Sequence, residues 1–395
     1  MMRYINLLSL IWFTSNLTMK GGLYLARLAQ LKLSMTISVL LLSILFALFS
    51  VIMVYLFPIL VGAVLFRQPL IFSSIDWLIV PLIVGTIIFI LIQYLVGPLI
   101  VRFSTKLRYL QPGENPWLES IVKELAQKSG LRMPKLAIVS DPTPNAFVFG
   151  WASWGATLAV HEGLLKQLNK EEIQGVIGHE LGHIKHRDFI VITVLSALPL
   201  IAYSIARLTF STALATDGGT KKEGNWLSEI LAQIALRLLL ILAAVISYVM
   251  YIVTLLCVLR VSRLREYYAD SYSAYLTGMP RVLSSALTKI TYGLSLSPQP
   301  PHGARTFYIG DPAQAKQECA IMLLKKREYD LDQDGVLDEK ELELAMEAEA
   351  RSKWTTINTW FATHPPTYQR ILLLREIEKE VQTGRYTNEH IYAHI

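Results

Sequence analysis

The chain has 395 residues, of which 53% are hydrophobic and only 17% are charged, and its mean hydropathy is +0.40. This composition favours a membrane protein over a soluble one, and we interpret the formal net charge of +6 as membrane orientation and headgroup attraction rather than nucleic-acid binding. Two cysteines, Cys257 and Cys319, provide no disulfide framework, as expected in a reducing cytoplasm.

Four stretches without Asp, Glu, Lys or Arg predict transmembrane helices, because a bilayer core needs about 20 apolar residues. They are 33–66, 77–101, 189–206 and 238–259. The third contains Pro199, and for it a buried core helix is the main alternative. Residues 1–32 are interpreted as a leader or interfacial segment.

Cationic residues gather beside these stretches and predict their orientation. They are Lys20, Arg27 and Lys32 before the first, Arg102, Lys106 and Arg108 after the second, and Arg260, Arg263 and Arg265 after the fourth. By the positive-inside rule, both termini and residues 102–188 are expected in the cytoplasm, in a multi-pass protein of the cell (inner) membrane.

Residues 102–188 predict the first part of a soluble domain. Apolar residues at helical spacing from Leu118 to Ala126 indicate an amphipathic helix that ends near Gly130. Three short apolar runs then predict a small antiparallel sheet. These runs are 136–139, 146–149 and 156–160.

The next helix carries the most informative motif of the chain, His179-Glu180-Leu181-Gly182-His183. Asn169, followed three residues later by Glu172, predicts its start, and no Gly-Pro stop precedes Asp188. Residues four apart share a helical face, so the two imidazoles can reach one ion, while Glu180 lies on the side where a water would be activated. This pattern is typical of zinc peptidases.

A catalytic zinc site requires a third protein ligand. His186 shares the helical face, but its backbone lies about 10.5 Å from that of His179, so joint binding with His183 would be strained. Glu266 is the preferred candidate, and Asp270, one turn later, can orient a zinc-bound histidine. Taken alone, this acidic pair would be interpreted as a solvated helical face.

Four motifs together resemble the HtpX-type membrane zinc endopeptidases, which are relatives of the CAAX prenyl endopeptidases. They are HELGH at 179–183, EYYAD at 266–270, PNAF at 144–147 and THPPTYQRI at 363–371. The resemblance covers about residues 112–300 and 360–376. It implies an integral-membrane gluzincin with an α+β zincin-type catalytic domain in the cytoplasm.

The resemblance also implies roles for individual residues. His179, His183 and Glu266 would hold one zinc ion, and Glu180 would polarise the attacking water. His364, otherwise an ordinary turn residue, matches a position that helps to stabilise the oxyanion. Arg370 would anchor the segment around His364.

Asn145 and Ala146 match the edge strand that aligns an extended polypeptide substrate in this family. Main-chain pairing with such an edge makes little demand on the substrate sequence. From the residues alone, an Asx turn is the alternative for Asn145, because Pro144 precedes it.

One segment departs from the family pattern and fits the twelve-residue EF-hand calcium loop, with Gly335 at the sixth position. Its ligand positions are Asp330, Asp332, Asp334, Val336, Asp338 and Glu341. Calcium is therefore a second candidate cofactor, and it could order the segment that completes the active site. Because EF-hands usually occur in pairs, a solvated acidic linker is the alternative.

The sequence as a whole predicts a mainly α membrane protein that acts as a zinc metalloendopeptidase in membrane-protein quality control, with its oligomeric state left open. Its expected parts are a leader (1–32), two transmembrane helices (33–101), the first catalytic part (102–188), two further transmembrane helices (189–259), the second catalytic part (260–310), the EF-hand-like insertion (311–355) and the C-terminal catalytic part (356–395).

Three alternatives to this function were weighed. A narrow-specificity CAAX-type processing protease carries the same motifs. An intramembrane protease is disfavoured by charged residues around the motif, such as Glu171 and Lys185. A calcium-sensing scaffold without activity is disfavoured because Glu180 is intact.

Overall fold

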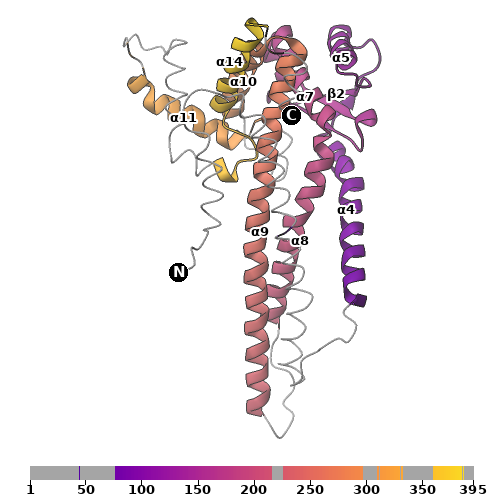
Figure 1. Cartoon of the computed structure of the whole chain (residues 1–395), viewed down its shortest axis with the longest axis vertical. Helices are drawn as coiled ribbons and strands as arrows, with labels where there is room; N and C mark the ends of the chain where they lie inside the picture. Colours follow the sequence, from indigo (N-terminus) through magenta and orange to yellow (C-terminus); the bar gives the residue numbers. More distant parts are fainter. Residues whose placement is uncertain are drawn as a thin grey trace. The chain divides into compact units, whose positions relative to one another are not determined.

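The computed structural model shows a mainly helical chain (Figure 1). The described residues are 76–215, 226–296, 309–310, 312–329 and 359–384, together with Ile44, Leu331 and Tyr386. Outside them lie the predicted leader, the predicted first span apart from Ile44, and all six predicted calcium ligands. The chain divides into two compact units, one containing Pro98–Ile190 and Leu259–Ile395 and the other containing Ser38–Gly97 and Val191–Val258.

The second unit contains most of three long apolar helices: α4 (Asp76–Ser104), α8 (Asp188–Ala215) and α9 (Trp226–Thr277). All three are long and apolar enough to cross a membrane, and Pro199 does not end α8. Gln93 of α4 donates a hydrogen bond to Ser196 of α8 (2.9 Å), and the rings of Tyr203 in α8 and Tyr251 in α9 lie 5.3 Å apart. Three of the four predicted spans therefore correspond to suitable helices.

The first unit is built from shorter helices and one sheet (Figure 1). The helices are α5 (Pro116–Lys128), α6 (Glu162–Gln167), α7 (Lys170–His186), α10 (Pro280–Leu296), α11 (Pro312–Tyr329) and α14 (Thr367–Gln382), with short 3-10 turns η2 (Ser153–Gly155) and η4 (Thr359–Phe361). The predicted amphipathic helix is α5, which begins with Asn115 as its N-cap and Pro116 in its first turn.

The sheet has four strands in the order β1-β2-β4-β3. They are β1 (Arg108–Tyr109), β2 (Lys135–Val139), β3 (Ala146–Phe149) and β4 (Thr157–His161). The three predicted strands are confirmed, but the prediction of an antiparallel sheet is wrong in one pairing, because β2 and β4 pair in parallel. The chain leaves β2, forms β3 as an edge strand and returns through β4 to the middle of the sheet, so the sheet is mixed.

One hydrophobic core joins the sheet to the helices of this unit. It includes Leu118 from α5, Leu158 from β4, Ile177 from α7 and Leu283 from α10. Helix α7 contacts α5, α10 and β3, and α10 contacts α11 and α14. The helix that bears the two motif histidines is thus held on several sides.

Candidate metal centre

Helix α7 is fixed at its N-terminus by the predicted capping box. The Asn169 side chain accepts a hydrogen bond from Glu172 N (2.8 Å), and the Glu172 carboxylate accepts one from Asn169 N (2.9 Å). The same carboxylate accepts hydrogen bonds from Lys289 Nζ (2.8 Å) and Ser285 Oγ (2.7 Å) of α10. The start of the helix is therefore tied to its neighbour as well as capped.

Glycines on α7 allow a close approach of α9. A Cβ atom added at Gly178 would lie 2.8 Å from Ser273 Oγ, and one added at Gly182 would lie 3.1 Å from Ala269 Cα. Ser273 Oγ also donates a hydrogen bond to Gly175 O (2.7 Å). This glycine seam, Gly178 and Gly182, lets α7 and α9 approach closely, whereas a Cβ atom at Gly175 would face Leu283 of α10 at 3.3 Å.

The close approach brings His179, His183 and Glu266 into one cluster. The Nε2 atoms of the two histidines lie 3.0 Å apart. His179 Nε2 lies 3.5 Å from Glu266 Oε2, and His183 Nε2 lies 3.6 Å from Glu266 Oε1. Zinc bound tetrahedrally at about 2.1 Å would set such ligand atoms roughly 3.4 Å apart.

The buried Glu266 carboxylate lies between the two histidines and Arg370. Its Oε2 is 3.5 Å from His179 Nε2 and 3.6 Å from Arg370 Nη1, and its Oε1 is 3.6 Å from His183 Nε2. A metal cation between the carboxylate and the two imidazoles would compensate this buried charge at closer range than Arg370 does. The donor set and its spacing therefore fit one zinc ion.

His179 is oriented from its other ring nitrogen by residues distant in the sequence. Its Nδ1 lies 2.9 Å from Asp270 Oδ1. Arg370 of α14 holds that carboxylate in a fork, with Nε 2.8 Å from Oδ2 and the second guanidinium nitrogen 2.7 Å from Oδ1. With Nδ1 donating to the carboxylate, Nε2 keeps its lone pair for a metal ion.

His183 has an equivalent arrangement, which the sequence did not suggest. Its Nδ1 lies 2.6 Å from Asp188 Oδ2, and Arg265 donates to the other oxygen of Asp188. Although no Gly-Pro stop precedes Asp188 in the sequence, α7 ends at His186, because Arg187 adopts a left-handed conformation (φ 58°). That turn directs Asp188 back towards His183.

The electrostatics of the cluster reflect burial and these carboxylates. Burial lowers the pKa of His179, but hydrogen bonds to Asp270 and Glu266 outweigh it and raise that pKa to about 9. Burial raises the pKa of Glu180 to about 7, although both histidines act against it. Burial also lowers the pKa of His183. Glu180 therefore lies in a buried environment in which a carboxyl group takes up a proton readily.

His364 joins the same cluster from the segment before α14. It is buried, and its Nε2 lies 3.8 Å from Glu266 Oε1, while Nδ1 lies 2.9 Å from Thr363 Oγ1. Arg263 of α9 donates hydrogen bonds to the carbonyl oxygens of Trp360 (3.1 Å) and Ala362 (2.7 Å). The segment is thus anchored by Arg263 of α9, while the predicted anchoring by Arg370 stays a prediction.

Asn145 and Ala146 lie at the start of the edge strand β3, which packs against α7. Asn145 is buried, and its side chain accepts a hydrogen bond from Ile309 N (2.9 Å), while its carbonyl accepts one from His161 N (2.9 Å). Arg370 donates to Ile309 O (2.7 Å). The Asn145 side chain therefore holds the 309 segment, which in turn binds an arginine of the cluster.

His186 lies apart from the metal cluster, as its backbone position on α7 predicts. Both of its ring nitrogens are buried without hydrogen-bond partners among the described residues. Its ring packs edge-on against Tyr268 (5.9 Å) and Tyr272 (5.5 Å). Burial, with help from nearby Arg265, lowers the pKa of His186 to about 4. This histidine is a neutral packing residue.

Sequence reasoning missed Asp188 and Arg265 as parts of the site. Asp188 lies five residues after His183 in the sequence. This spacing would have indicated a contact between the two only if the end of the helix before Asp188 had been known. Arg265 precedes Glu266 and was interpreted only as an orientation signal. The six predicted calcium ligands lie outside the described residues, so that hypothesis stays a prediction.

The chain is similar in sequence to known proteins. The sequence profile described as "Peptidase family M48" matches residues 112–378. A "Protease HtpX homolog" of Aeropyrum pernix is 30% identical over 292 residues, which cover 74% of this chain and 84% of that protein. A protein of the same description from Methanocaldococcus jannaschii is 34% identical over 290 residues, which cover 73% and 85%. The crystal structure of S. mikatae Ste24p aligns with a TM-score of 0.42 and 17% identity, over 87% of this chain and 66% of that one.

Proposed function

Because this chain belongs to peptidase family M48 and is a membrane metalloprotease, we propose that His179, His183 and Glu266 hold its zinc ion. The observation that carries the proposal is the convergence of the three ligand atoms within 4.8 Å of one another. The carboxylates behind both histidines support it further, because they leave each Nε2 free to bind metal.

The reaction is hydrolysis of a peptide bond, and Glu180 is its general base. Zinc, when bound, polarises the scissile carbonyl and makes a water molecule more acidic. Glu180 accepts a proton from the attacking water and passes it to the leaving amine. Its burial supports this role, since it keeps bulk water from competing for the proton.

His364 stabilises the negative charge that develops on the carbonyl oxygen. Its Nε2 faces the cluster beside Glu266, and its Nδ1 is held by Thr363. Replacement of His364 by Ala, which removes the donor, is expected to lower kcat about 100-fold, as for the loss of one oxyanion donor. Zinc content should be unchanged, and an unchanged kcat would remove His364 from the mechanism.

Polypeptide substrates pair with the edge of β3 that faces away from β4. Ala146 is the first residue of this strand, and β4 occupies its other edge. The main chain from Asn145 onwards would bind an extended peptide, because the Asn145 side chain is engaged by Ile309. This mode fits broad cleavage of damaged membrane proteins by a cytoplasmic domain at the inner membrane.

Cleavage of casein by the detergent-purified, zinc-loaded protein tests the assignment. Glu180→Gln should lower the rate about 10³-fold, the scale of general acid–base catalysis, while zinc binding stays intact. Cleavage that persists unchanged in Glu180→Gln would contradict the role of Glu180. Cleavage of a prenylated CAAX peptide, with none of casein, would replace the quality-control function with narrow processing.

A further inference from the structure

Helix α14 begins without a side-chain cap of its own. Its N-cap residue is Pro366, preceded by Pro365, and proline offers neither a side-chain acceptor nor a backbone N–H. The backbone N–H of Thr367 is therefore one of the amides that the helix leaves unpaired. This helix carries Arg370 in its first turn, and His364 lies just before it.

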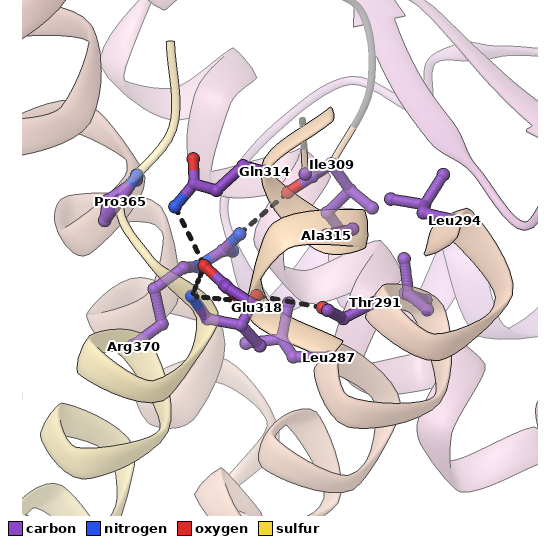
Figure 2. Close-up of a pocket in the computed structure, with 12 residues that line it drawn as sticks. Leu287, Thr291, Leu294, Ile309, Gln314, Ala315, Glu318, Pro365 and Arg370 are labelled. Atoms are coloured by element: carbon purple, nitrogen blue, oxygen red, sulfur yellow. Dashed lines mark hydrogen bonds between the residues drawn. The ribbon is translucent and has the colours of Figure 1, made fainter. Parts of the chain in front are cut away.

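Glu318 of α11 supplies the missing acceptor from outside the helix. Its two carboxylate oxygens lie 3.2 and 3.3 Å from Thr367 N, 49 residues away in the sequence. Gln314, one turn earlier on α11, donates a hydrogen bond to the same carboxylate (2.9 Å), as Figure 2 shows. A carboxylate at this end of α14 also complements the positive pole of the helix dipole.

The capped turn is connected directly to the metal cluster. Thr367 Oγ1 exchanges a hydrogen bond with Thr291 Oγ1 of α10 (2.9 Å). Arg370, three residues further on, holds Asp270, which in turn orients His179. A displacement of the first turn of α14 would move the guanidinium that fixes this histidine.

The carboxyl group of Glu318 lies in a buried position, where a charged group is unfavourable unless it has a role. Glu318 borders a narrow cavity of about 10 Å³, room for a single water molecule, lined also by Leu287, Leu294 and Arg370 (Figure 2). Burial raises the pKa of Glu318 to about 7, although Gln314 and Thr367 donate hydrogen bonds to it. Peptide hydrolysis as described above makes no use of this group.

We propose that Glu318 is a positioning residue for the metal centre. By accepting the hydrogen bond of Thr367 N–H, it holds the start of α14, so that Arg370 stays on Asp270 and His364 stays beside Glu266. The effect on catalysis rests on the proposed peptide hydrolysis, whereas the effect on zinc affinity rests only on the proposed metal ligands.

The experiment compares Glu318→Leu, which lacks an acceptor, with Glu318→Gln, which keeps one, in the full-length protein in detergent. Three quantities are measured: kcat and KM for casein, the zinc Kd by chelator competition, and the absorption spectrum of the Co²⁺-substituted protein. Glu318→Leu should lower kcat and raise the zinc Kd about tenfold each, as for other residues that support metal ligands, with KM little changed. The Co²⁺ spectrum should shift, and Glu318→Gln should stay close to wild type.

A control and a rescue separate capping from general damage. Glu328→Leu, at an exposed position on the same helix, should match wild type in all three measurements. Pro366→Asp, which gives α14 its own N-cap, should restore zinc affinity and kcat when combined with Glu318→Leu. If Glu318→Leu fails to fold, Gln314→Leu, which removes only the hydrogen bond that orients the carboxylate, should still raise the zinc Kd about threefold.

The proposal is overturned if Glu318→Leu, or Gln314→Leu in its place, lowers the unfolding midpoint while zinc Kd, Co²⁺ spectrum and kcat stay at wild-type values. Equal losses in Glu318→Leu and Glu318→Gln would also overturn it, because the acceptor would then be irrelevant. A wild-type protein that binds zinc but cleaves nothing would refute the proposed hydrolysis alone, since zinc Kd and the Co²⁺ spectrum would still report on Glu318.

Discussion

The two histidines of α7 are supported by the same chemistry, but their supports differ in origin. Behind His179 stand Asp270 and Arg370, which lie far along the chain on α9 and α14. Behind His183 stands Asp188, only five residues further on, backed by Arg265. The His179 side chain is 1% exposed, whereas that of His183 is 16% exposed.

The difference separates a support that requires the assembled domain from one set mostly by a local turn. Asp270 and Arg370 can orient His179 only when α9 and α14 have both packed against α7. Their ion pair is then buried away from water. Unpairing such a buried ion pair is expensive, while a local, less buried arrangement loses less. Four measurements test this contrast and the surroundings of the metal centre.

The largest effect is expected for Arg370→Met. It leaves the Asp270 carboxylate buried without its fork of hydrogen bonds, so the free energy of unfolding should fall by about 3 kcal/mol. Denaturant unfolding in detergent measures this. Arg375→Met, on the same helix but partly exposed, is the matched control and should change stability by about 0.5 kcal/mol or less. Similar losses of unfolding free energy in the two variants would show that the hydrogen bonds of Arg370 to Asp270 contribute little to stability.

The free energy of unfolding should depend on pH through His186, a histidine with buried ring nitrogens and no carboxylate beside it among the described residues. The pKa of His186 is about 4 in the folded protein and 6.5 in the reference state, so the unfolded chain takes up its proton first as the pH falls. Stability is therefore complete above pH 6.5 and is lost between pH 6.5 and 4, by on the order of 2 kcal/mol. His186→Phe should remove this share of the loss. Parallel stability curves for the two proteins would contradict the assignment.

Asp188→Asn should have a smaller effect on stability than Arg370→Met. The amide still offers an oxygen to His183 but loses the charge that faces Arg265, so about 1.5 kcal/mol of stability and about tenfold in zinc affinity should be lost. Chelator competition and unfolding in the same detergent provide both values. Destabilisation as large as that of Arg370→Met would abolish the distinction between the two supports.

The smallest effect concerns the predicted calcium loop, which follows α11 in the sequence. Calcium at about five times its Kd should add about 1 kcal/mol to the free energy of unfolding, and Glu341→Gln should abolish that gain. Because α11 holds the start of α14, peptidase activity should rise with calcium at fixed zinc. Equal activity with calcium and with a calcium-selective chelator would speak against the regulatory hypothesis.

The elements that could be predicted from the sequence are those with local physical signals. The capping box at Asn169, the amphipathic face of α5 and the long uncharged runs each follow from neighbouring residues alone. The cluster of His179, His183 and Glu266 was reached by spacing, by the need for a third ligand and by resemblance to a family.

The remainder depended on contacts that no local pattern encodes. Arg187 adopts a positive φ angle, which is uncommon for residues other than glycine. A glycine at this position would have indicated the end of the helix, whereas an arginine gives no such signal. The role of Asp188 was hidden with it. The parallel pairing of β2 with β4 and the cap that Glu318 provides for α14 arise from tertiary packing across many residues.

The glycine seam of α7 has a consequence for attempts to make the enzyme more robust. Replacing a helical glycine by alanine is a standard route to higher thermostability, because alanine has the better helix propensity. At Gly178 and Gly182 the added methyl group would meet α9 at 2.8 and 3.1 Å and push that helix away. Since α9 carries Glu266, an alanine introduced at these positions would move one proposed metal ligand away from the other two.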